Sequence, residues 1–87
     1  MTISRVIPQL YVGDLEGANN KAGLQKVGVT HILQVMGGME PLFRSDFKYK
    51  VMDVRDVATE NIGSHFASTV KWMTDVINRG GTIYCHW

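Results

Sequence analysis

Two scarcities and one missing feature limit what this chain can be. It has one cysteine in 87 residues, so no internal disulfide can form and a disulfide-stapled secreted mini-protein is excluded. No run of about 18 apolar residues occurs, which argues against a membrane span. Nine Lys and Arg oppose eight Asp and Glu, and a net charge of +1 gives no general field that collects nucleic acid or anionic lipid. We therefore expect neither partner, and a reducing location in the cytoplasm or nucleus.

What is present suffices for one small folded unit. The hydrophobic fraction of 45% with 20% charged residues is that of a globular chain, and the length excludes two domains. The two prolines, Pro8 and Pro41, lie at natural breaks, and no repeat or linker divides the sequence. Residues 1–87 are therefore treated as a single unit.

Short apolar runs alternate with helical patterns along the chain. The predicted strands are residues 3–7, 10–12, 30–36, 47–52 and 82–87. One helix is predicted from Asp14, a suitable N-cap, to Gly28, and a longer one from residue 61 to the Gly80-Gly81 pair. This order predicts an α/β fold with helices packed on a central, mostly parallel sheet.

The longer helix carries apolar residues at intervals of three and four. These residues are Ile62, Phe66, Val70, Met73 and Ile77. Such spacing places them on one face of a helix, so we expect them to contact the sheet. Trp72 and Phe66 are assigned to the core for the same reason, not to a ligand cage.

Cys85 and His86 resemble a nucleophile beside its base, but neighbours in a strand point to opposite faces of the sheet. Cys85 is therefore expected to be a small buried hydrophobe, and His86 to orient a neighbouring loop or satisfy buried polar groups. His31 and His65 have no Cys, Asp or Glu at ligand spacing, so no metal site and no cofactor are expected.

Asp53 and Asp56 follow a predicted strand and precede the long helix. Ligands of open α/β sheets bind where such loops leave the carboxyl ends of the strands. A D-x-x-D pair is in itself a weak signal, because solvated acids in loops are far commoner than catalytic ones.

Three phrases, in order, resemble the dual-specificity phosphatases of the protein tyrosine phosphatase superfamily. They are I-P-x-L-Y-V-G-D at residues 7–14, L-x-x-x-G-V-T-H-I-L at residues 24–33 and D-V-A-T-E-N-I-x-x-H-F at residues 56–66. The similarity continues through the glycine pair and the last strand. The resemblance thus covers essentially the whole chain.

The resemblance implies a cysteine phosphatase acting on phosphoproteins. In this family a thiolate attacks phosphorus, a loop closed by Arg holds the phosphoryl oxygens, and an Asp protonates the leaving oxygen. It places Asp56 in the position of that general acid, with Asp53 as the weaker candidate. His86 occupies the family's histidine position, but Trp87 stands where the nucleophilic cysteine belongs. Cys85 lies two residues earlier, about 6 to 7 Å back along the strand, and cannot replace it.

The favoured interpretation is a partial dual-specificity phosphatase catalytic domain that stops before the phosphate-binding loop and is inactive as given. The alternatives are a non-catalytic, phosphatase-like binding module, or pseudophosphatase, and an unrelated small α/β protein. If further helices of the domain are missing, apolar surface on the last strand and the long helix should be exposed. Marginal stability or aggregation is then expected.

Overall fold

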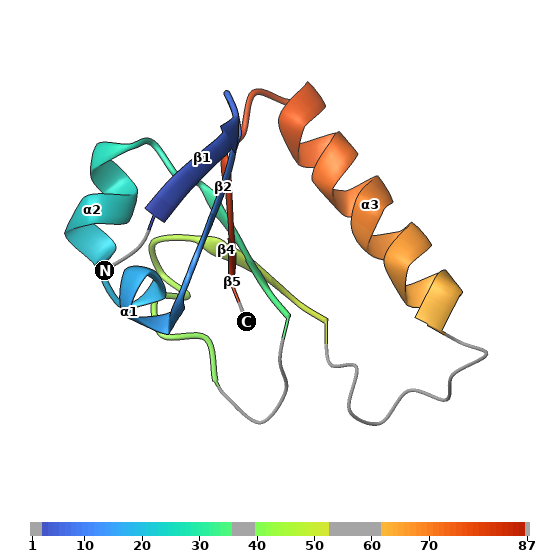
Figure 1. Cartoon of the computed structure of the whole chain (residues 1–87), viewed down its shortest axis with the longest axis horizontal. Helices are drawn as coiled ribbons and strands as arrows, with labels where there is room; N and C mark the ends of the chain where they lie inside the picture. The colour runs from blue at the N-terminus through green and yellow to red at the C-terminus, as the bar shows by residue number, and fades with distance from the viewer. Residues whose placement is uncertain (1–2, 36–39, 53–61, 87) are drawn as a thin grey trace.

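A five-stranded sheet organises the chain in the computed structural model, which describes residues 3–35, 40–52 and 62–86 (Figure 1). The strands are β1 (Ile3–Ile7), β2 (Leu10–Gly13), β3 (His31–Gln34), β4 (Lys48–Val51) and β5 (Ile83–His86). Their order is β1-β2-β5-β3-β4, and all neighbours are parallel except β1 and β2, which form an antiparallel pair. The predicted mostly parallel α/β fold is confirmed.

The helices lie on both faces of the sheet. They are α1 (Leu15–Ala18), α2 (Lys21–Lys26) and α3 (Ile62–Asn78). Figure 1 shows α1 and α2 on one side of the strands and α3 on the other. The connection from β2 to β3 runs through α1 and α2, and the connection from β4 to β5 runs through α3. The sheet therefore lies between two helical layers.

The single helix predicted after Asp14 is wrong, because the structure has two short helices there. Asp14 does cap the first, accepting a hydrogen bond from the Gly17 amide at 2.8 Å. Asn20 caps the second, its side chain accepting from the Gly23 amide at 3.1 Å. An Asn side chain that satisfies the first amides of a new helix competes with continuation of the old one, which explains the break.

Glycines end α2 and α3 as predicted. Gly28 and Gly80 have φ of +86° and +82°, the left-handed conformation that L side chains rarely adopt. Gly81 serves another purpose, since a Cβ atom there would lie 2.7 Å from a methyl carbon of Val76. The glycine pair therefore stops α3 and brings its end close to β5.

The sheet face beneath α1 and α2 holds the better buried part of the core. Its members are Ala18, Leu24, Val29, Ile32, Phe47 and Tyr84. Ile32 and Tyr84 are paired across β3 and β5, and neither is exposed to solvent. Apolar side chains from two central strands and two helices thus close this face.

The face beneath α3 is less complete. Leu33, Val76 and Ile83 are buried there, while Trp72, Met73 and Ile77 are only partly so. The prediction that Phe66 and Val70 belong to the core is wrong: they are 51% and 59% exposed. The spacing of three and four residues predicts one apolar face. In the structure α3 is rotated so that Thr69 and Val76 face the sheet, and the flank with Phe66 and Val70 faces solvent.

The expected exposure of apolar surface is therefore right for α3 and wrong for the last strand. In β5, Ile83, Tyr84 and His86 are buried and Cys85 is half-buried, because β5 lies between β2 and β3. A strand with neighbours on both sides and helices over both faces has little surface left to expose.

Candidate functional site

The carboxyl ends of β3, β4 and β5 meet at one edge of the sheet, on the side from which α3 starts (Figure 1). The Val35 amide donates to the His86 carbonyl at 2.8 Å, and the Met52 amide donates to the Gln34 carbonyl at 2.8 Å. The end of β5 and the end of β4 are thus two strand spacings apart, about 10 Å. Any group that follows Met52 leaves the sheet near the end of β5.

The two candidate acids and the residue at the nucleophile position fall outside the described part of the chain. Asp53, Asp56 and Trp87 are not among the residues that the structure describes. The structure does describe the residues that directly precede these segments. They are Met52, just after β4, and His86, the last residue of β5. The roles of Asp56 and Asp53 therefore remain predictions.

His86 is buried at the end of β5, with 2% of its surface exposed. Its ring stacks on Tyr84 with centroids 5.9 Å apart and planes at 26°. Burial lowers the pKa of His86, so the neutral imidazole is favoured. Its Nδ1 atom has no hydrogen-bond partner among the described residues. A neutral, buried ring packed in this way suits a positioning role better than that of a general base in water.

Cys85 and His86 face opposite sides of the sheet, as predicted. Cys85 packs with the cluster beneath α3, whereas His86 lies beside Leu15 and Ala18 on the α1 face. Burial raises the pKa of the Cys85 thiol, which keeps it protonated at neutral pH. A protonated thiol directed toward α3 is neither a partner of His86 nor a replacement nucleophile.

Two polar contacts at this edge were not found by sequence reasoning. Gln34 is 2% exposed at the end of β3, between the ends of β4 and β5. The signal in the sequence was an amide side chain that directly follows the apolar pair Ile32 and Leu33 in β3. The Tyr84 hydroxyl donates to the Asp14 carbonyl at 2.7 Å and so ties β5 to the start of α1. That contact spans most of the sequence and leaves no local pattern.

No metal centre or membrane-crossing helix is found in the described ranges. Within residues 3–35, 40–52 and 62–86, no group of three His, Cys, Asp or Glu side chains is placed to hold a metal ion. None of the helices in those ranges combines the length and apolar character that a transmembrane helix needs.

The comparisons with known proteins agree with this architecture. The chain is 35% identical over 77 residues to dual specificity protein phosphatase 1 of Arabidopsis thaliana, covering 88% of this chain and 39% of that protein. The crystal structure of DUSP15 matches with a TM-score of 0.81 at 26% identity, over 97% of this chain and 53% of that one. The chain thus covers less than two thirds of the length of each of these proteins. No family model matches it.

A third similar protein is named as phosphatase-like rather than as a phosphatase. The crystal structure of the human tyrosine phosphatase-like serine/threonine/tyrosine-interacting protein matches with a TM-score of 0.78 at 28% identity, over 97% of this chain and 60% of that one. A TM-score of 0.78 over 97% of this chain shows that the two share the same fold over that length. The sheet order, the three ordered phrases and these relatives together show that the chain is similar, in sequence and in fold, to part of the dual-specificity phosphatases.

Proposed function

We propose that this chain supplies the sheet and the general acid of a protein phosphatase that acts on phosphotyrosine and phosphoserine or phosphothreonine. One observation carries the proposal. The sheet brings the end of β5, which precedes the family's nucleophile position, to the same edge as the end of β4, from which residues 53–61 continue to α3. An acid in that segment and a nucleophile after His86 can then approach one phosphoryl group from two sides.

The chemistry proposed for the family's complete site proceeds in two steps. A cysteine thiolate after His86 attacks phosphorus, the S–P bond forms, the ester O–P bond breaks, and the Asp56 carboxyl gives its proton to the leaving oxygen. Water then attacks the phosphocysteine, Asp56 takes a proton from it, and the S–P bond breaks to release phosphate. His86 is a positioning residue in this scheme.

The 87-residue chain itself should not perform this reaction. Trp87 occupies the nucleophile position, and an indole cannot attack phosphorus. We expect its hydrolysis of an aryl phosphate to equal the buffer blank. Turnover by the purified chain that disappears in Asp56→Asn would contradict this statement.

A chimera tests the catalytic proposal. It joins this chain, carrying Trp87→Cys, to the part of the Arabidopsis relative's domain that follows the equivalent position. We expect aryl phosphate hydrolysis, and a loss of kcat of at least about 100-fold in Asp56→Asn. Asp53→Asn is the matched control and should retain most of the activity. Equal losses in the two variants, or a loss confined to Asp53→Asn, would overturn the assignment of Asp56.

A non-catalytic binding module is the second candidate. Two observations favour it: Trp87 at the nucleophile position, and the similarity to the human tyrosine phosphatase-like interacting protein. Calorimetric titration of the chain with a phosphotyrosine peptide and with its unphosphorylated form separates the candidates. Saturable binding of the phosphorylated form alone supports the module, whereas no binding of either form argues against it.

A further inference from the structure

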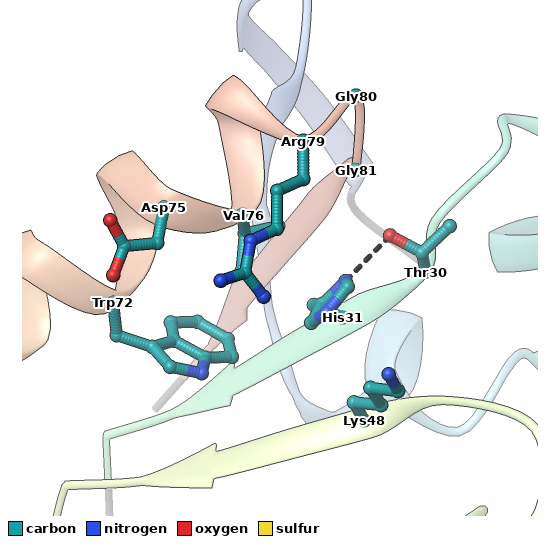
Figure 2. Close-up of a pocket in the computed structure, with 9 residues that line it drawn as sticks. All are labelled: Thr30, His31, Lys48, Trp72, Asp75, Val76, Arg79, Gly80 and Gly81. Carbon is teal, nitrogen blue, oxygen red and sulfur yellow. Dashed lines mark hydrogen bonds between the residues drawn. The ribbon is translucent and has the colours of Figure 1, made fainter.

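A hollow of about 500 Å³ lies at the opposite edge of the sheet, where α3 ends and β3 and β4 begin (Figure 2). Pockets that bind small ligands have volumes of about 300–1,000 Å³. Trp72 of α3 and Arg79, which follows the end of α3, line one side, His31 and Lys48 line the other, and Thr30 lies at the end. The four-residue strands separate this hollow from the carboxyl edge by about 13 Å.

Positive charge predominates in the hollow. Among the described residues, neither Lys48 nor Arg79 forms an ion pair. The acid that lines the hollow, Asp75, is paired with Lys71 at 3.2 Å, and Figure 2 shows its carboxylate directed away from His31. The Arg79 side chain reaches into the space between α3 and β3. Two cations that form no ion pair within the described ranges therefore border a hollow whose lining acid already pairs with Lys71.

Aromatic rings form the apolar part of the lining. The Trp72 and His31 rings meet edge to face, with centroids 5.7 Å apart and planes at 70°. Trp72 is only partly buried, so part of its indole is open to the hollow. An indole surface beside cationic side chains is suited to a flat ring that bears a negative charge.

His31 can take a proton in place without losing its hydrogen bond. Its Nδ1 lies 2.7 Å from the Thr30 hydroxyl oxygen, which in turn lies 3.2 Å from the Thr82 carbonyl. With neutral His31, the Thr30 hydroxyl donates to Nδ1. With protonated His31, Nδ1–H donates to the Thr30 oxygen, and the hydroxyl turns to the Thr82 carbonyl. Either state leaves the lining intact.

We propose that this hollow binds a planar aromatic carboxylate, with the ring against Trp72 and the carboxylate between Lys48 and Arg79. The site is distinct from the carboxyl edge, so it does not depend on the catalytic proposal. Charge-assisted hydrogen bonds from an ammonium and a guanidinium would hold the carboxylate, and the indole would cover the ring. The ligand class follows from that combination: a neutral ring would leave both cations unpaired, and a small inorganic anion would leave the indole uncovered.

The test is a titration of the ¹⁵N-labelled chain with naphthalene-2-carboxylate, followed by NMR. We expect saturable shifts of the Trp72 indole N–H and of the amides around Gly80, with much weaker shifts from naphthalene-2-carboxamide. Lys48→Gln and Arg79→Gln should each weaken binding about tenfold. Lys50→Gln is the matched control, on the same strand and the same sheet face, and should leave affinity unchanged. Equal binding of the carboxamide, equal losses in Lys48→Gln and Lys50→Gln, or no saturable shift would overturn the proposal.

The dependence of affinity on pH gives a second readout. Burial, and then the charge of Lys48, lower the pKa of His31, and a bound carboxylate would oppose both effects. Among the described residues, the other charged groups that line this region are Asp75 from α3, Arg79 just after α3, and Arg44 and Asp46 from the loop before β4. Protonation of His31 would add a positive charge beside the bound carboxylate. Affinity should therefore rise as pH falls from about 8 to about 5, the range in which imidazoles gain a proton, and His31→Gln should abolish the rise. A rise of the same size in His31→Gln would contradict the assigned contact.

Discussion

The two faces of the sheet are closed to different degrees. Beneath α1 and α2, the core residues are buried and a long-range hydrogen bond from Tyr84 fixes β5 to the start of α1. Beneath α3, the buried cluster consists of Leu33 and Ile83 from the sheet and Val76 from the helix itself, and the flank of that helix with Phe66 and Val70 is exposed. The difference teaches that the fold's stability rests mainly on the first face. The second face is held more weakly and is the one open to further contacts.

Truncating a matched pair of leucines should show this difference most strongly. Leu24 is completely buried on the first face, and Leu10 is partly buried on the second. We expect Leu24→Ala to lower the free energy of unfolding by about 3 kcal/mol, since it removes buried methyl groups and leaves a cavity. Leu10→Ala should cost about 1 kcal/mol, because water already reaches part of that side chain. Urea unfolding followed by circular dichroism measures both, and equal losses would erase the distinction.

The Tyr84 hydroxyl provides a smaller effect confined to the first face. Removing its hydrogen bond to Asp14 in Tyr84→Phe should cost about 1 kcal/mol near neutral pH. Burial, followed by the charges of Asp14 and Cys85, raises the pKa of Tyr84 to about 12. Folding therefore favours the neutral phenol.

The sign of the pH dependence follows from this raised pKa. The stabilisation from neutral Tyr84 is complete below the unfolded-state pKa of about 10 and is lost as pH rises from there toward 12. Wild-type stability should fall more steeply than that of Tyr84→Phe over this interval. Parallel curves from thermal melts at pH 9 to 11.5 would show that Tyr84 is not responsible.

Polar substitutions on the exposed flank of α3 should have the smallest effect on stability. Phe66→Gln and Val70→Gln remove apolar side chains that are more than half exposed, so the free energy of unfolding should change by no more than about 0.5 kcal/mol. Self-association should fall instead, because an exposed apolar patch promotes contacts between copies.

Light scattering against concentration measures that self-association. Thr74→Gln is the control, since Thr74 is exposed on the same helix and is not apolar. Unchanged association in the double variant Phe66→Gln, Val70→Gln would show that this flank does not mediate it. A large loss of stability would show that the flank is packed after all.

The fold could be predicted from the sequence because its main signals are local. Apolar runs marked the strands, and Gly28 and Gly80 marked the ends of α2 and α3. The break between α1 and α2 was missed because capping by Asn20 competes with a pattern that also fits one helix. The orientation of α3 was missed because spacing identifies an apolar stripe but not how the helix rolls against the sheet.

The candidate site was only partly predictable for the same reason. The opposite orientations of Cys85 and His86 follow from strand geometry alone, and the structure confirms them. The hollow at the amino ends of β3 and β4 could not be predicted, because His31 and Lys48 lie on two different strands and Arg79 follows α3, far along the sequence. No local motif connects residues that only the crossovers bring together.

The most direct test of the central claim is the pH dependence of kcat in the catalytic chimera. A general acid must be protonated to donate, so kcat should fall at high pH in the chimera with Asp56 intact. The account predicts that Asp56→Asn lowers kcat and flattens this basic limb, while Asp53→Asn leaves the limb in place. A basic limb that persists in Asp56→Asn and vanishes in Asp53→Asn would contradict the account.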